Sequence, residues 1–326
     1  MKNTQKIIAL VITIIVVASG VAYFVIVNSS SAKSISASGN ITVTDSLGRS
    51  FTFAHPVHKI VSIDPSAVVT LYALGAYHDL VGGSQFDYYP PNSTKQIPNV
   101  GDYYGINTEE ILNLSPQVVL TYGDSLSKDA AYINNTLHIP VLVDNPNSFS
   151  AIENMTTMLG RLTGTVANAT KINNWMNQSI STLENQTKNI TYNYSVFYLL
   201  STYGGYWTAG NGTFINSIFK YAHLHNIASK NGYFTMSAEN IVSSNPQVIF
   251  FSQYEKFSAV DREPFNSTSA FYNNRIYPIF NDNFFNQPDF RVIYALWWVI
   301  STVYPGTQAH IPPFPIKLKY PPTTGF

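Results

Sequence analysis

Apolar residues recur at helical spacing along two consecutive stretches between residues 150 and 189. Each stripe follows the periodicity of one helix face: Ile152, Met155, Leu159 and Leu162, then Ile172, Trp175, Met176, Ile180 and Leu183. Gly164 separates the stripes, and residues 151–189 contain none of the chain's 18 prolines. The pattern predicts two helices in series, the second of which can act as a rigid connection rather than a linker.

A similar unit lies on each side of these helices, at residues 108–120 and 238–250. In both, Glu109 or Glu239 opens a short segment, Pro-Gln follows seven residues later, and an apolar run comes next. Because proline ends a helix and a continuous apolar run is typical of a strand buried on both faces, each unit predicts a helix followed by a strand. Chance similarity of two ordinary units is the alternative. The shared offset favours a repeat, and so two similar lobes joined by a helix.

The chain begins with a long apolar run, residues 7–27, behind Lys2 and Lys6. A helix of this length spans about 31 Å, enough to cross a hydrocarbon core of about 30 Å. The lysines favour an N-terminus on the inner side, with everything after the run outside. We predict an uncleaved signal anchor followed by a Ser-rich tether; cleavage within residues 30–38 is the alternative. The chain has no cysteine, which excludes disulfides and a lipid-modified cysteine.

Composition changes this picture in two ways. Only 11% of residues are charged and the formal net charge is zero, so no nucleic-acid footprint is visible. The glycosylation pattern Asn-x-Ser/Thr occurs more often than this composition predicts by chance, at Asn28, Asn40, Asn92, Asn113, Asn134, Asn154, Asn168, Asn177, Asn185, Asn189, Asn193, Asn211 and Asn266. This excess favours an exported, glycosylated surface protein.

Several short stretches follow one another in the order of a known family. Residues 41–45 and 50–53 predict a hairpin, 58–63 a buried strand, and 64–74 a helix. Together with Leu80-Val81-Gly82, residues 97–101, Ile139-Pro140-Val141, residues 208–214 and residues 269–277, they resemble the class III solute-binding proteins, which serve ABC importers of cobalamin, haem and ferric siderophores. The resemblance covers about residues 41–305.

The resemblance implies an α/β fold with two similar lobes, mainly parallel sheets, a bridging helix and a ligand cleft between the lobes. With the sequence patterns it gives these parts: signal anchor 1–28, tether 29–40, N-terminal lobe 41–165, bridging helix 166–190, C-terminal lobe 191–305 and Pro-rich tail 306–326. The tail is expected to lie extended over the body or loose in solvent. The implied partner is an ABC permease, and the ligand is a cobalt or iron chelate rather than a resident cofactor.

Ligands of open α/β sheets bind beyond the carboxyl ends of the strands, so the loops after Ile63, Ser84, Tyr122, Leu200, Phe251 and Phe280 are candidates. Those loops are rich in aromatic residues, whose flat rings can stack on a large planar ligand. The candidate ligand-binding residues are Tyr88, Tyr89, Tyr103, Tyr104, Tyr206, Trp207, Tyr254, Phe284 and Phe285. The alternative for each is an ordinary role in core packing.

Residues 87–91, Asp-Tyr-Tyr-Pro-Pro, resemble the Asp-Tyr-Pro-Pro loop of cobalamin-binding members but carry one extra residue, which leaves open which tyrosine corresponds. This favours cobalamin over a ferric siderophore or haem. Siderophore binders often place Arg in the cleft, and here Arg262, Arg275 and Arg291 do not cluster in the sequence.

By the same resemblance, Glu109 and Glu239 each present a carboxylate to arginines of the permease. The alternative is that each simply stabilises the first turn of its helix. We find no nucleophile elbow, dinucleotide or phosphate loop, or zinc-protease motif, so no catalytic residue is predicted. His223 and His225 lie in residues 214–227, which favour a helix, so no metal site is predicted. A chelatase-like enzyme and a glycosylated structural surface protein remain alternative functions.

Overall fold

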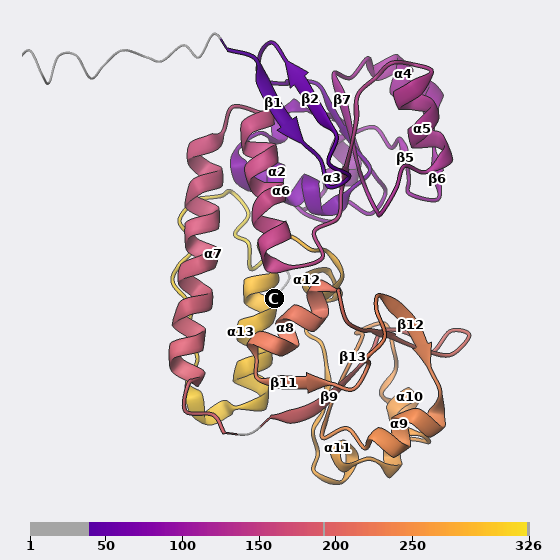
Figure 1. Cartoon of the computed structure of the whole chain (residues 1–326), viewed down its shortest axis with the longest axis vertical. Helices are drawn as coiled ribbons and strands as arrows, with labels where there is room; N and C mark the ends of the chain where they lie inside the picture. The colour runs from indigo at the N-terminus through magenta and orange to yellow at the C-terminus, as the bar shows by residue number, and fades with distance from the viewer. Residues whose placement is uncertain (1–38, 192, 325–326) are drawn as a thin grey trace, which may run out of the picture. The chain divides into compact units, whose positions relative to one another are not determined.

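The computed structural model describes residues 39–191 and 193–324 (Figure 1). Within it, Asn40–Phe326 forms one compact unit. The predicted membrane anchor, residues 7–27, lies outside the described residues. No helix among those described is both long and apolar enough to cross a membrane.

The first sheet has four parallel strands, β3 (Ile60–Ser62), β4 (Leu80–Gly82), β7 (Val118–Tyr122) and β8 (Val141–Asp144), in the order β4-β3-β7-β8. The central strands are buried along almost their whole length, which explains why they read as continuous apolar runs rather than alternating ones. The connecting helices are α2 (Pro65–Leu74), η1 (Tyr77–Asp79), α3 (Ser93–Gln96), α4 (Thr108–Leu114) and α5 (Lys128–Asn135).

The second sheet repeats this topology with β9 (Tyr194–Leu199), β11 (Leu224–Asn226), β13 (Val248–Phe251) and β14 (Ile276–Pro278), in the order β11-β9-β13-β14. Its strands are again parallel, and the second strand in sequence again lies outside the first. The surrounding helices are α8 (Phe214–Tyr221), α9 (Ala238–Ser244), α10 (Phe257–Val260), η2 (Phe265–Ser267), α11 (Ser269–Tyr272) and α12 (Asp282–Asn286). The predicted repeat of an α/β unit with parallel strands is therefore confirmed.

The Pro-Gln pair of the repeat has a structural reason. Gln117 Oε1 accepts hydrogen bonds from the backbone N–H groups of His58 (2.8 Å) and Lys59 (3.1 Å), just before β3. In the second sheet, Gln247 Oε1 accepts from the N–H of Ser195 (3.1 Å) in β9. Each glutamine thus satisfies backbone donors at the start of the neighbouring strand, which would otherwise lack a partner.

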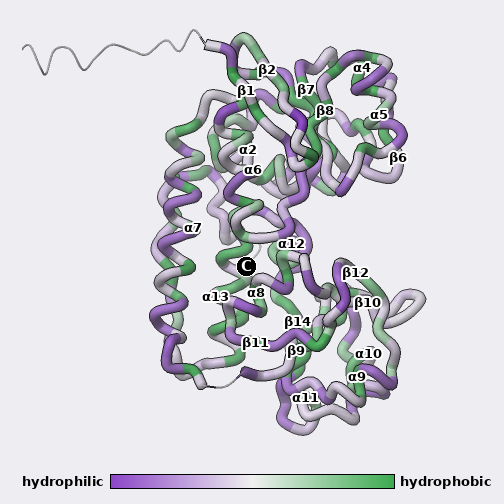
Figure 2. The backbone as a smooth tube through the Cα atoms, viewed as in Figure 1, coloured by the Kyte–Doolittle hydropathy of each residue, from purple (hydrophilic) through white to green (hydrophobic). Residues whose placement is uncertain are grey.

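Two long helices join the sheets, as the apolar stripes predicted: α6 (Phe149–Leu162) and α7 (Val166–Thr187). Hydrophilic and hydrophobic segments alternate along α7, as in an amphipathic helix, and its apolar stripe is buried (Figure 2). α6 and α7 approach closely at Gly160, where an added Cβ would lie 2.5 Å from the Cβ of Ala169. α7 runs alongside both halves of the unit (Figure 1).

Three antiparallel pairs complete the fold: β1 (Ile41–Thr44) with β2 (Ser50–Phe53), β5 (Gly101–Asp102) with β6 (Gly105–Ile106), and β10 (Tyr206–Ala209) with β12 (Tyr233–Met236). The first pair is the predicted hairpin. The helix expected over residues 214–227 is right for α8 and wrong for residues 224–226, which form β11. Leu224 buries its side chain against the core in this strand, so sheet packing overrides the local helical preference.

The chain ends with α13 (Val292–Val303), η3 (Pro305–Thr307) and an extended tail. The tail is not loose in solvent. The indole N–H of Trp297 donates to the carbonyl of Ala309 (2.7 Å), and that of Trp175 in α7 donates to the carbonyl of Pro312 (2.8 Å). Proline-rich backbone lacks its own hydrogen-bonding pattern, so these side-chain donors fix its path over the body.

Candidate functional site

The carboxyl ends of the first sheet carry a cluster of tyrosines. Tyr103 and Tyr104 form the turn between β5 and β6, and Tyr122 ends β7. The ring of Tyr103 lies 5.0 Å from that of Tyr122 and 5.8 Å, edge-on, from that of Tyr104. Tyr104 is 91% exposed, so this cluster offers an open aromatic surface.

The structure separates the two adjacent tyrosines of residues 87–91. Tyr88 is 53% exposed, and Phe86 is its edge-on ring neighbour at 6.4 Å. Tyr89 is 3% exposed, and its hydroxyl donates to the carbonyl of Tyr320 in the tail (2.6 Å). Tyr88 can therefore meet a ligand, whereas Tyr89 belongs to the core.

A second aromatic group follows the strands of the second sheet. The indole N–H of Trp207 donates to the carbonyl of Tyr203 (3.0 Å), which closes the turn between β9 and β10. Glu255 accepts from the backbone N–H (2.8 Å) and hydroxyl (2.9 Å) of Thr202, so the loop after β13 is tied to the loop after β9. This bond brings the exposed Tyr254 close to the exposed Tyr203 and Trp207. Tyr206, half-buried, packs edge-on against Phe265 beneath them (5.4 Å).

Phe284 and Phe285 are core residues in the structure. Both are fully buried on α12, and both rings contact Phe280. The sequence predicted a loop after a strand here. Instead, α12 turns both rings inwards, and its first residue, Asp282, accepts hydrogen bonds from Ser252 and Gln253 just after β13. Phe284, Phe285 and Tyr89 are therefore too buried to touch a ligand in this structure, and the prediction that they bind one is corrected.

Sequence reasoning missed three buried carboxyl groups at the carboxyl edge of the first sheet: Asp64 after β3, Asp87 after β4, and Asp144 at the end of β8. Asp64 Oδ1 accepts from the N–H of Ser66, and Asp87 Oδ2 from the N–H of Ser84. Among the described residues, however, Asp64 Oδ2, Asp87 Oδ1 and Asp144 Oδ2 have no hydrogen-bond partner. The signal available in the sequence was an aspartate just after or at the end of successive strands.

These surroundings favour the protonated acids. Burial, with a smaller contribution from the nearby Asp144, raises the pKa of Asp64 to about 7. Burial likewise raises the pKa of Asp87 to about 7 and that of Asp144 to about 6. Arg49 donates through Nε to Asp45 (3.0 Å) and, within the described part of the chain, forms no ion pair with these three acids. A neutral carboxyl group needs less solvation than a carboxylate, so this edge of the sheet is best suited to acids that carry their protons.

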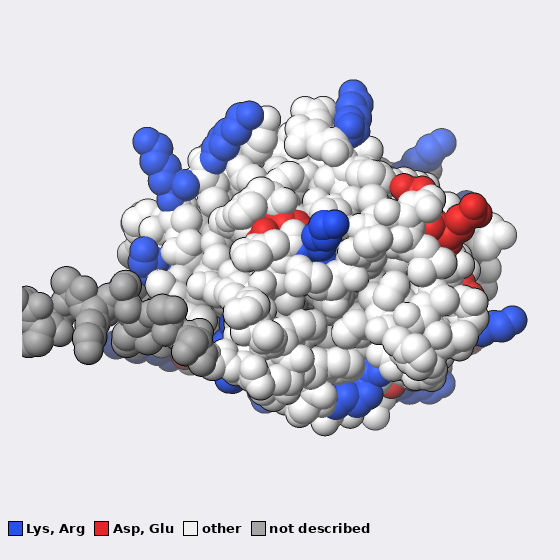
Figure 3. Space-filling model, turned by 90° about the horizontal axis from the view of Figure 1, so that it is seen from above, with Lys and Arg blue, Asp and Glu red and all other residues white. Residues whose placement is uncertain are grey.

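Glu109 and Glu239 occupy equivalent positions in α4 and α9, and both side chains are exposed. The two helices lie towards opposite ends of the compact unit and on the same side of it, away from α7 (Figure 1). Backbone hydrogen bonding at the start of α9 and the hydroxyl of Ser237 lower the pKa of Glu239, so the helix terminus does favour its charge. Charged side chains elsewhere are sparse and scattered on the face seen in Figure 3.

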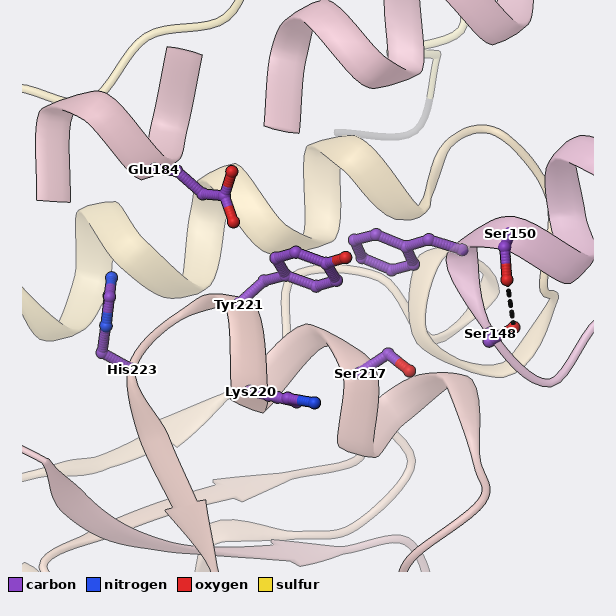
Figure 4. Close-up of a pocket in the computed structure, with 8 residues that line it drawn as sticks. Ser148, Ser150, Glu184, Ser217, Lys220, Tyr221 and His223 are labelled. Atoms are coloured by element: carbon purple, nitrogen blue, oxygen red, sulfur yellow. Dashed lines mark hydrogen bonds between the residues drawn. The ribbon is translucent and has the colours of Figure 1, made fainter. Parts of the chain in front are cut away.

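Two surface pockets lie away from the aromatic loops. One, about 330 Å³, lies among α6, α7 and α8, with Glu184, Lys220 and Tyr221 on its wall (Figure 4). The other, about 340 Å³, lies between β1 and α6. Neither has an aromatic ligand candidate in its wall. His223 Nε2 bonds to Thr187 Oγ1 (3.0 Å), and within the described residues no group of three or more His, Asp or Glu side chains could hold a metal ion.

Comparison with known proteins agrees with this architecture. Residues 60–279 match the sequence profile of the periplasmic binding protein family. The chain belongs to this family. The match begins at the first residue of β3 and ends just after β14, so it includes both parallel sheets and the helices that join them.

Individual relatives of this periplasmic binding protein share less than a third of its residues. It is 28% identical to the uncharacterized ABC transporter substrate-binding lipoprotein YvrC of Bacillus subtilis, over 82% of this chain and 86% of that protein. It is 26% identical to a cobalamin-binding protein of Halobacterium salinarum, over 78% and 71% respectively. The crystal structure of the periplasmic vitamin B12 binding protein BtuF of Vibrio cholerae has a similar fold, with a TM-score of 0.68 and 22% identity, over 78% of this chain and 99% of that one.

Family membership confirms the resemblance found in the sequence. It places the chain in a family of binding proteins rather than of enzymes. The family match stops before α13 and the tail.

Proposed function

We propose that this protein is an extracytoplasmic solute-binding protein that captures a bulky metal chelate, most specifically cobalamin, and delivers it to an ABC permease. The observation that carries the proposal is the pair of exposed aromatic surfaces at the carboxyl ends of two equivalent parallel sheets. The names of the similar proteins, an ABC transporter substrate-binding lipoprotein and a cobalamin-binding protein, support the same class.

The proposed ligand contacts are Tyr88, Tyr103 and Tyr104 on the first half, and Tyr206, Trp207 and Tyr254 on the second. Flat rings bind a macrocycle by stacking and by removing its apolar surface from water, at about 1.5–3 kcal/mol per well-buried side chain. The proposed lobes, residues 41–165 and 191–305, each contribute one of these surfaces. The bridging helix, residues 166–190, limits their relative motion to small hinge changes.

Electrostatics support a ligand without strong negative charge. The guanidinium of Arg275 lies 4.3 Å from the ring centre of Tyr194, and Arg291 is buried in an ion pair with Asp289 (2.7 Å). Neither guanidinium is therefore free to meet a ligand at the exposed rings. Carboxylates of haem and anionic siderophores are best met by arginine, so this arrangement favours cobalamin, whose macrocycle carries neutral amides.

We further propose that Glu109 and Glu239 dock the protein on the permease, one from each half. Both are exposed at equivalent points of the repeat. Two charged contacts far apart define an orientation as well as an affinity, which suits delivery to a symmetric channel.

Residues 7–27 are proposed to anchor the chain in the cytoplasmic membrane, with Asn40–Phe326 outside. Exposed asparagines of the Asn-x-Ser/Thr pattern, among them Asn154, Asn185 and Asn189, support glycosylation on that side.

A titration of Asn40–Phe326 tests the ligand. Tryptophan fluorescence is followed on addition of cobalamin, haem or a ferric hydroxamate, with free tryptophan as the control for light absorption by the ligand. Saturable binding of cobalamin at micromolar affinity or better supports the proposal. Tighter binding of haem or the hydroxamate reassigns the ligand within the same class. Failure of all three overturns the chelate-binding proposal and favours the structural surface protein.

A further inference from the structure

We propose that the C-terminal tail positions the ligand-binding loop: Tyr320 of the tail fixes Tyr89, and thereby sets the place of the neighbouring Tyr88. Here the tail means residues 308–324 and the ligand loop means residues 84–93. The inference rests on the proposed function for the role of Tyr88 and concerns a segment outside the family match, which ends at residue 279.

The central observation is that two tyrosines of the first half form hydrogen bonds with the backbone carbonyl and the backbone N–H of Tyr320. The hydroxyl of Tyr89 donates to the Tyr320 carbonyl (2.6 Å), and the Tyr320 N–H donates to the hydroxyl oxygen of Tyr72 (2.9 Å). The rings of Tyr72 and Tyr89 also meet edge-on, with centroids 5.4 Å apart. These three residues form one hydrogen-bonded and packed unit, although 231 residues separate Tyr89 from Tyr320.

The tail is itself fixed to the bridging helix α7 and to the second half of the molecule. His310 donates its N–H to Gln186 Oε1 of α7 (2.9 Å), and Trp175 donates to Pro312. Phe314 stacks on Phe290 with centroids 4.9 Å apart and an angle of 22° between the rings. Because the tail is held by α7 and by residues next to α13, the position of Tyr320 depends on the bridging helix and on the second half.

Tyr89 has a second contact with that half. The guanidinium of Arg291 lies 4.9 Å from the ring centre of Tyr89 and 5.0 Å from that of Phe284. Arg291 is 1% exposed and is oriented by Asp289 and by Gln287 Oε1 (3.0 Å). A cation confined between two rings and an ion pair has little freedom, so the Tyr89 ring is held on this side as well.

Tyr88 lies between two anchored residues. Asp87 Oδ2 accepts from the N–H of Ser84 within the loop (2.7 Å), and Tyr89 is held as described. The backbone of Tyr88 is therefore fixed from both sides while its ring remains exposed. The extra tyrosine of residues 87–91 thus has a distinct function: one tyrosine faces the ligand, and the other connects the loop to the tail. A preorganised ring loses less conformational freedom when it binds, which raises affinity.

Four forms of the full-length chain, in detergent, test this. They are the unaltered chain, a chain lacking residues 317–326, the point variant Tyr89→Phe, and a control lacking only residues 324–326. The first readout needs no ligand: hydrogen–deuterium exchange of residues 84–93. We expect faster exchange there in the chain lacking 317–326 and in Tyr89→Phe, with α6 and the second sheet unchanged, and no change in the control.

The second readout is cyanocobalamin affinity by calorimetry. One lost hydrogen bond is expected to weaken binding about 3- to 10-fold in Tyr89→Phe. If the tail acts through Tyr88, the effect disappears in a Tyr88→Ala background. A purely stabilising tail predicts the same loss in both backgrounds, and that result would overturn the proposal.

The two proposals fail separately. Unaltered exchange of residues 84–93 in Tyr89→Phe contradicts the positioning role, whatever the ligand. Faster exchange without cobalamin binding by the unaltered chain supports positioning and contradicts the ligand assignment. If the chain lacking residues 317–326 does not fold, Tyr89→Phe, which removes a single hydroxyl, decides alone.

Discussion

The ring of Phe149 stacks on that of Tyr221, with centroids 5.0 Å apart and planes 2° from parallel. Phe149 begins α6, which packs on the first half, and Tyr221 ends α8 of the second. The contact therefore joins the two halves next to α7, on the wall of the pocket shown in Figure 4.

Replacing Tyr221 by alanine removes this contact between the halves. We expect the free energy of unfolding to fall by about 2 kcal/mol, since an aromatic pair contributes about 0.5–1.5 kcal/mol beyond the area it buries. Urea titration followed by circular dichroism measures the change. Tyr132→Ala, at an exposed tyrosine of α5, is the control and should stay within about 0.5 kcal/mol of the unaltered protein. Equal losses in both variants would contradict a special role for the stack.

The buried acids predict that the protein is more stable in acid. The pKa values of Asp64, Asp87 and Asp144 are raised from about 3.8 to about 7, 7 and 6. The folded state thus holds protons that the unfolded chain releases, so the stabilisation is complete below about pH 4 and is lost progressively as the pH rises from about 4 to about 7. Thermal unfolding between pH 3 and 8 should show a Tm that declines over this interval.

Asparagine resembles the protonated acid in shape and cannot ionise. Combined Asp64→Asn, Asp87→Asn and Asp144→Asn substitutions should flatten this decline, while Asp261→Asn, on the surface, should leave it in place. Asp45, which pairs with Arg49, is kept unchanged in all of these proteins. A triple variant with the same decline as the unaltered chain would show that other groups are responsible.

Trp207→Ala and Tyr88→Ala should each weaken ligand binding about 10- to 100-fold. Each substitution removes a ring whose burial in the complex is expected to contribute about 1.5–3 kcal/mol of binding free energy. Calorimetry with cyanocobalamin measures this. Tyr272→Ala removes a still more exposed ring on α11, outside the strand-end loops, and should bind normally. Similar losses in Tyr272→Ala would argue against a localised aromatic site.

Glu109→Ala and Glu239→Ala should leave ligand affinity unchanged and weaken docking to the permease about 10-fold or more each, since a charged hydrogen bond contributes about 1.5–3 kcal/mol. Uptake of labelled cobalamin by cells or proteoliposomes is the measurement. Glu110→Ala, at the next residue of α4, is the matched control. Uptake that falls only in proportion to lost protein stability would instead assign both glutamates to helix stabilisation.

The close approach of α6 and α7 gives a prediction with a built-in rescue. Gly160→Ala places a methyl group 2.5 Å from the Cβ of Ala169, so stability should fall by about 1–3 kcal/mol. Adding Ala169→Gly removes the clash and should recover part of the loss, although glycine costs about 1 kcal/mol within a helix. If the second substitution only adds to the first loss, the helices do not meet at this point.

Local pattern alone was sufficient for the repeated architecture. The Glu and Pro-Gln offsets that relate residues 109–117 to 239–247 correspond to equivalent helices and strands, and the two apolar stripes to α6 and α7. These features depend on neighbours within one or two turns of the chain, so periodicity and breakers are enough to predict them.

The candidate site depended on contacts between distant residues. Tyr88 and Tyr89 are adjacent residues of the same type, so the sequence does not distinguish them. The contacts of Tyr89 with Tyr320 and Arg291 are what make one ring buried and leave the other exposed. The burial of Phe284 and the assembly of Asp64 with Asp144 arise in the same way. Sequence alone determined which elements form and in what order, because that depends on local periodicity. Only the tertiary structure decided which side chains face the solvent, because burial is set by whatever packs against them from elsewhere in the chain.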